Sequence, residues 1–110
     1  MNVYDEAHNL AKAVKESNEY KEYMRLREET AKDEMLSKML KDLQELQVAI
    51  QTAQITGQTI DESQMSQFQS VYAMLAAKPL AAEYMQAEVR FSMMVKDVFD
   101  ILGDAINITR

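Results

Sequence analysis

The sequence predicts an all-α protein, and three observations support this prediction. The 110 residues include only two glycines and one proline, where average usage would give about 8 and about 5, so few turns and long elements are expected. Alanine, leucine, methionine, glutamate, lysine and glutamine dominate, and all favour helices. Hydrophobic residues recur at steps of three and four. We expect an antiparallel bundle of four to five helices with a long C-terminal helix, formed by residues 1–110 as a single, oligomeric domain.

Two helices are expected at the N-terminus. Asn2 is a good N-cap with Asp5 three residues later, and this arrangement favours a helix start. The apolar residues that follow at helical spacing are Val3, Ala7, Leu10, Ala11 and Val14. They predict a helix over 3–16. Ser17 and Asn18 offer a second cap, so a short helix is expected from there to about Thr30.

Two further helices are expected in the middle of the chain. An a/d heptad seam predicts a helix over 33–56, ended by Gly57. Its members are Leu36, Met39, Leu43, Leu46, Ile50 and Ala53. Thr59 and Glu62 stand at capping-box spacing, so the next helix is expected from near residue 60, and Pro79 ends it. The seam of that helix is Met65, Phe68, Tyr72 and Leu75.

The C-terminal helix has the strongest pattern. Its seam is Leu80, Tyr84, Ala87, Phe91, Met94, Val98, Ile101, Ala105 and Ile108. A second apolar row flanks it and consists of Val95, Phe99, Leu102 and Ile106. A helix of about 29 residues is roughly 43 Å long. With so wide an apolar face it is expected to contact neighbours on two sides, which a small monomeric bundle does not easily provide.

The region 46–77 lacks Lys and Arg, and its only acids are Asp61 and Glu62 at the turn. Glutamine, serine and threonine fill its polar positions. Because depletion of charge is typical of interface centres, we expect this hairpin to pack against another copy of the chain. The predicted interface residues are Leu43, Leu46, Gln47, Ile50, Gln51, Gln54, Phe68, Tyr72 and Leu75. The alternative is that the hairpin is the middle of its own bundle.

Composition also excludes several classes of protein. The chain has no cysteine, so disulfides, zinc–cysteine sites and thiol nucleophiles are excluded. The net charge of −6 disfavours direct binding to nucleic acid or to an anionic membrane. No stretch is long and apolar enough to span a bilayer, and the N-terminus does not resemble a secretory signal. A cytoplasmic location is expected.

No catalytic, cofactor or metal site is expected. His8 is the only histidine, and carboxylate-bridged di-iron bundles need Glu-x-x-His pairs from two helices. Asp97, Asp100 and Asp104 share one face of the last helix and are interpreted as a solvated acidic stripe, since no ligand-rich loop accompanies them. The serines lack a nucleophile-elbow context, and the two glycines form no phosphate loop. A non-enzymatic protein without cofactors is therefore predicted.

Four segments together resemble the YlbF/YmcA superfamily of small bacterial helical proteins, and within it the YheA-like branch. They are VYDEA (3–7) with Leu10 and Ala11, SNEY (17–20), LQELQ (43–47) running to Gly57, and PLAAEYMQAE (79–88). The resemblance implies an all-α, oligomeric, non-enzymatic protein of a Gram-positive cytoplasm. The best-studied members of this superfamily act in a complex that influences competence, sporulation and biofilm formation. That complex also adjusts an endoribonuclease, so the resemblance implies a regulatory role of this kind. Some relatives bind iron–sulfur clusters through cysteines, a property that this cysteine-free chain does not share.

Three functional hypotheses follow. The first is an interaction protein: a helical homo-oligomer, expected to be a dimer, that docks onto another protein. The second is a regulatory adaptor of an endoribonuclease in a developmental-control complex, as the resemblance implies. The third is a bundle that binds a metal or a small ligand.

Overall fold

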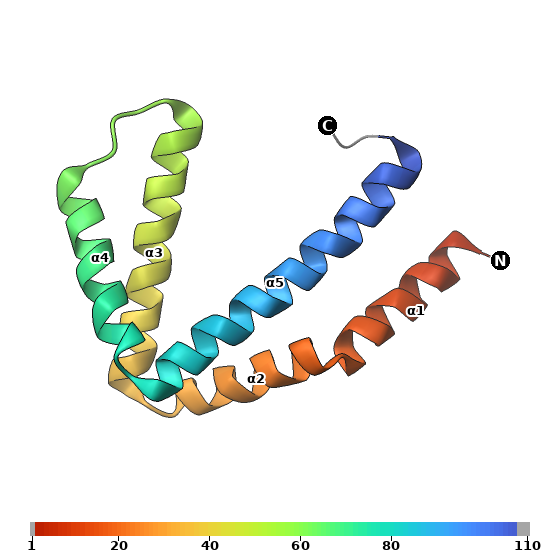
Figure 1. Cartoon of the computed structure of the whole chain (residues 1–110), viewed down its shortest axis with the longest axis horizontal. Helices are drawn as coiled ribbons and strands as arrows, with labels where there is room; N and C mark the ends of the chain where they lie inside the picture. Colours follow the sequence, from red (N-terminus) through yellow and green to blue (C-terminus); the bar gives the residue numbers. More distant parts are fainter. Residues whose placement is uncertain (1, 108–110) are drawn as a thin grey trace. The chain divides into compact units, whose positions relative to one another are not determined.

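The computed structural model describes residues 2–107, which form five α-helices and no β-strand (Figure 1). The helices are α1 (Val3–Glu16), α2 (Asn18–Ala31), α3 (Glu34–Thr56), α4 (Glu62–Ala76) and α5 (Pro79–Ile106). The predicted all-α class with a long C-terminal helix is confirmed. Ile108, the last residue of the predicted seam of α5, lies outside the described residues.

The first two helix boundaries agree closely with the sequence prediction. The Asn2 side-chain oxygen accepts hydrogen bonds from the backbone N–H groups of Tyr4 (2.8 Å) and Asp5 (3.4 Å). These N–H groups have no partner inside the helix, so the cap stabilises the start of α1. Ser17 Oγ donates to the carbonyl of Val14 (2.6 Å) and accepts from the N–H of Tyr20 (3.1 Å). One serine therefore ends α1 and caps α2.

The start of α4 differs from the prediction. A capping box of Thr59 and Glu62 was expected, but Asp61 is the N-cap and its side chain accepts from the N–H of Ser63 at 2.8 Å. The helix consequently begins at Glu62. Thr59 and Asp61 are both good caps. Asp61 lies closer to the apolar seam of α4, so its carboxylate accepts a hydrogen bond from a backbone N–H of the first turn.

Gly57 ends α3 in the left-handed conformation, with φ 75° and ψ 13°. The N–H of Gln58 donates to the carbonyl of Ala53 at 2.9 Å, as in a Schellman motif. A Cβ at Gly57 would meet no atom within 4 Å. The glycine is therefore required by backbone conformation and not by lack of space.

Gly57→Val is expected to lower the free energy of unfolding by about 1–2 kcal/mol, the cost of a left-handed conformation for a residue with a side chain. Gly57→Asn is the matched control and should lose less, because asparagine tolerates this conformation. Urea unfolding followed by circular dichroism measures both values. Equal losses for the two variants would contradict the conformational explanation.

The chain divides into two compact units. One consists of residues 1–27 with 84–110, and we call its described part, 2–27 with 84–107, the arm. The other, residues 28–83, is called here the hairpin. Each unit takes parts of α2 and α5, because the boundaries fall within these helices.

In the arm, α1 and the first part of α2 follow one another along α5, which runs in the opposite direction (Figure 1). Aromatic rings connect α2 to α5. Tyr23 stacks on Phe91 with ring centroids 5.2 Å apart and on Tyr84 at 5.7 Å, and Tyr20 lies 5.5 Å from Phe91. Such pairs each contribute about 0.5–1.5 kcal/mol beyond their buried area. This cluster therefore holds the two helices together.

In the hairpin, α3 packs against α4 as an antiparallel pair (Figure 1). Leu36, Leu43 and Ile50 of α3 are buried, each seven residues after the last. Leu75 of α4 is completely buried. Half of the predicted heptad seam therefore lies in the core of the hairpin, whereas its other members, Met39, Leu46 and Ala53, are half-buried.

Candidate functional site

The predicted interface residues of the hairpin fall into three groups. Leu43, Ile50 and Leu75 are buried within the chain. Leu46 and Phe68 are half-buried. The exposed members are Gln47, Gln51, Gln54 and Tyr72. The three buried residues serve the core of the hairpin, so only the half-buried and exposed residues are available to a partner.

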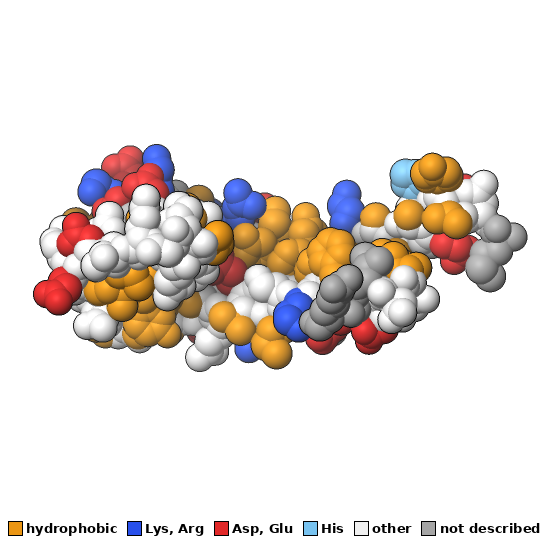
Figure 2. All heavy atoms as spheres, turned by 90° about the horizontal axis from the view of Figure 1, so that it is seen from above, with side chains coloured by type: hydrophobic (Ala, Val, Ile, Leu, Met, Phe, Trp, Pro, Cys, Tyr) orange, Lys and Arg blue, Asp and Glu red, His pale blue; other side chains and the backbone are white. Residues whose placement is uncertain are grey.

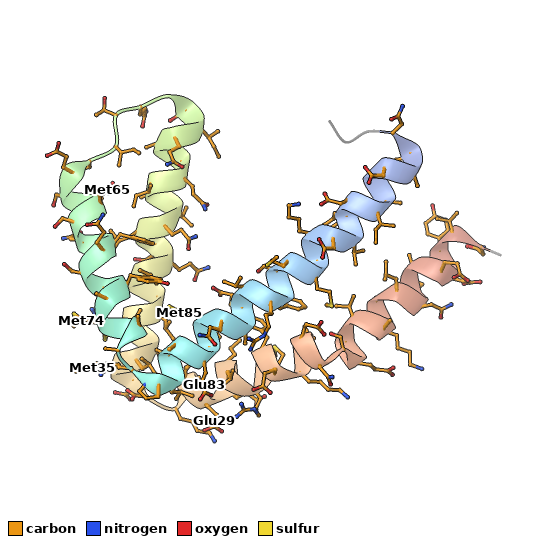
Figure 3. All side chains as sticks on the ribbon, in the orientation of Figure 1. Glu29, Met35, Met65, Met74, Glu83 and Met85 are labelled. Atoms are coloured by element: carbon orange, nitrogen blue, oxygen red, sulfur yellow. The ribbon has the colours of Figure 1, made fainter. Side chains whose placement is uncertain are left out.

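The hairpin also exposes apolar side chains that the sequence prediction missed. Val48 and Ile55 lie on the outer face of α3, seven residues apart, and Met74 projects from α4 near its C-terminal end (Figure 3). At the left of Figure 2, white and orange surface covers the middle of the hairpin, and acidic and basic side chains lie at its edge. The absence of charge between residues 46 and 77 therefore marks a surface, and this surface is polar with scattered apolar residues.

An open hollow of about 580 Å³ lies between α3 and α4. Its lining from α3 is Asp42, Glu45, Leu46 and Ala49, and from α4 it is Gln64, Ser66, Gln67, Ser70 and Val71. Of the predicted interface residues, only Leu46 lines it. Gln47, Gln51 and Gln54 do not line the hollow, because they lie on the other flank of the α3 seam.

The arm exposes more large apolar side chains than the hairpin. No residue of α1 is buried, although its apolar residues follow one face. The second apolar row of α5 is uncovered near its end, where the exposed fractions of Phe99 and Leu102 are 66% and 56%. We define the arm surface as the exposed apolar residues of α1 and of the last turns of α5: Val3, Tyr4, Leu10, Phe99, Ile101, Leu102 and Ile106. Figure 2 shows hydrophobic side chains along the arm.

The candidate metal ligands are His8 on α1 and the aspartates of α5. His8 is exposed on α1. Asp100 accepts a 2.7 Å hydrogen bond from Lys96, and this contact raises the pKa of Lys96. Among residues 2–107, no group of three or more histidine or acidic side chains is placed to hold a metal ion. In the same range, no helix has both the length and the apolar character needed to cross a bilayer.

Tyr84 titrates abnormally, because burial raises its pKa, and a hydrogen bond with Tyr23 adds to the effect. The ordinary pKa of tyrosine is about 10. The unfolded chain therefore loses this proton near pH 10 while the folded chain keeps it, so the stabilisation is present below pH 10 and is lost as the pH rises further. We expect the free energy of unfolding to fall more steeply above pH 10 in the wild type than in Tyr84→Phe.

Urea unfolding at a series of pH values measures the two slopes. Tyr4→Phe is the matched control, since Tyr4 is exposed on α1, and it should retain the wild-type slope. Equal slopes for Tyr84→Phe and the wild type would show that the Tyr84 hydroxyl is not involved.

Comparison with known proteins gives consistent matches over nearly the whole chain. The family described as control of competence regulator ComK, YlbF/YmcA, matches residues 3–107. A UPF0342 protein of Desulfitobacterium hafniense is 38% identical over 106 residues, 96% of this chain and 86% of that protein. A UPF0342 protein of Caldicellulosiruptor bescii is 33% identical over 105 residues, covering 96% and 88%. A protein of unknown function (DUF964) from Bacillus stearothermophilus has a similar structure, with TM-score 0.81, 21% identity and coverage of 96% and 92%.

Proposed function

The chain belongs to the YlbF/YmcA family, described as control of competence regulator ComK, and we propose that it works as a helical interaction protein without catalytic activity. In this proposal, copies of the chain associate with one another through the arm surface. The assembled protein then docks onto a second protein and thereby takes part in regulation. The family description supports a regulatory role, and the distribution of apolar side chains supports the mode of action.

The arm surface is the observation that carries the proposal. Its seven side chains are between 47% and 80% exposed. Summed over α1 and α5, they present on the order of 800 Å² of surface at these fractions, since aromatic side chains bury roughly 150–250 Å² each and aliphatic ones somewhat less. A stable interface buries about 800 Å² per partner, so the summed apolar surface of the two helices is of the size that a second copy needs.

The hairpin is less suited to this contact. Three of its predicted interface residues, Leu43, Ile50 and Leu75, are already occupied in its own core. Of its predicted interface residues, the exposed ones are mainly the amides Gln47, Gln51 and Gln54, which gain little when they leave water. We therefore assign self-association to the arm surface and leave the hairpin for a different partner.

Sedimentation equilibrium of the purified wild-type chain tests this proposal. At micromolar concentration we expect a mass of at least twice the 12.6 kDa of one copy. The mass should fall towards a single copy on dilution, because association depends on concentration. A mass of one copy throughout the micromolar range would overturn the proposal.

A further inference from the structure

The hollow between α3 and α4 has the form of a seat for one added helix. Asp42, Glu45, Leu46 and Ala49 line its α3 side at the spacing i, i+3, i+4 and i+7, which forms one stripe along a helix. The stripe extends over about two turns, or roughly 10 Å. Because the hollow is open along this length, it suits side chains projecting from a third helix better than an enclosed small molecule.

The chemistry of the lining is amphipathic. Leu46, Ala49 and Val71 supply apolar surface, and Gln64 and Gln67 border it with amides. Within residues 2–107, these two amides make no hydrogen bond. Their donors and acceptors are therefore available to a bound segment.

The charge of the lining determines the kind of segment. The residues that line the hollow include Asp42 and Glu45 but no lysine, arginine or histidine, and Lys38 and Lys41 lie about one turn before them on α3. Asp42 accepts a hydrogen bond from Lys38 at 3.3 Å, but both side chains are exposed, so this pair is weak and replaceable. Among the described residues, Glu45 makes no ion pair. The acidic side chains beside the hollow therefore favour a cationic partner and repel an acidic one.

We propose that this groove binds an amphipathic helix of a partner protein whose apolar stripe is flanked by lysine or arginine. The inference rests on the proposed function, in which the arm surface holds the copies together and the hairpin remains accessible. Helix α5 of a second copy would fit this groove poorly, because it carries aspartates such as Asp97 and Asp100, which the acidic lining repels. Lysines of the bound helix would lie beside Glu45 and Asp42, and its apolar residues would contact Leu46, Ala49 and Val71.

The test uses the full chain and a fluorescently labelled synthetic helical peptide with leucines at i, i+3, i+4 and i+7 flanked by lysines. Fluorescence anisotropy gives the Kd. We expect Glu45→Gln to raise the Kd about tenfold, as for the loss of one desolvated charge pair. Ala49→Gln, which fills the groove without adding charge, should raise it by a similar factor. A peptide with glutamates in place of the lysines should not bind measurably.

Gln51→Lys is the matched control. It changes the net charge by the same amount as Glu45→Gln and lies on the same helix, but it does not line the hollow. It should leave the Kd within about twofold of the wild type, as screening weakens exposed charges beyond the binding site. Equal weakening by Glu45→Gln and Gln51→Lys, or no effect of Ala49→Gln, would show diffuse attraction and overturn the groove inference.

Light scattering on the same samples separates this inference from the proposed function. Groove variants should retain the mass of the wild-type assembly and the wild-type circular dichroism. If Ala49→Gln or Glu45→Gln instead reduces the mass to one copy, the groove is a contact between copies and the inference is wrong. If the wild type itself has the mass of one copy but binds the peptide at the groove, the self-association proposal fails and the groove stands.

Discussion

Replacing Phe99 and Leu102 by lysine is expected to weaken self-association at least a hundredfold. Complete burial of such a side chain contributes about 1.5–3 kcal/mol; since Phe99 and Leu102 are 66% and 56% exposed in the single chain, burial of the exposed part by a second copy contributes about 1–2 kcal/mol each. Since 1.4 kcal/mol corresponds to a factor of ten in affinity, the loss of the two contacts alone corresponds to roughly a factor of 30–700. The cost of placing two lysines in an apolar contact adds to this. Sedimentation equilibrium of the double variant measures the effect.

The matched control is the double variant Val89→Lys and Met93→Lys. These residues lie on the same helix with similar exposed fractions of 56% and 58%, but they occupy a face that the arm surface does not include. The control adds the same charge and should keep the mass of the wild-type assembly. If both double variants dissociate to the same extent, the assembly does not depend specifically on the arm surface.

Leu75→Ala is expected to lower the free energy of unfolding by about 3 kcal/mol. Leu75 is completely buried in the hairpin, so truncation removes its apolar contacts and leaves a cavity. Urea unfolding at one fixed protein concentration measures the change, because association also contributes to apparent stability.

Met74→Ala is the control for this change. Met74 is the preceding residue of α4 and is 56% exposed, so its truncation should alter stability by no more than about 0.5 kcal/mol. If truncation of Met74 lowers the free energy of unfolding as much as truncation of Leu75, then Leu75 does not have the special place in the core of the hairpin that its burial indicates.

Most of the fold was predictable because the helix signals are local. The Asn2 cap, the heptad of Leu36, Leu43 and Ile50, and the left-handed Gly57 each depend on residues within one or two turns. The start of α4 was predicted wrongly, because Thr59 and Asp61 are both acceptable caps and sequence alone does not rank them. The division into arm and hairpin depends on long-range packing, for which periodicity carries no information.

The candidate surfaces were only partly predictable for a related reason. Periodicity identified the apolar row that contains Phe99 and Leu102, and it favoured neighbours on both sides of α5, but it could not show which neighbours the chain supplies. The absence of charge in 46–77 drew attention to the hairpin. Leu43, Ile50 and Leu75, however, are buried there by the chain itself. The hollow beside Ala49 gave no sequence signal, because it arises from the packing of α3 against α4.

The most direct test of the account is the reactivity of a single thiol at Leu102→Cys towards a maleimide. The chain has no native cysteine, and cysteine is a small apolar residue that the proposed contact can accept. At micromolar concentration, we expect this thiol to react much more slowly than one at Asp97→Cys, which lies on the acidic stripe of α5, and to become reactive on dilution. Equal, concentration-independent rates at the two positions would contradict the claim that a second copy covers the arm surface.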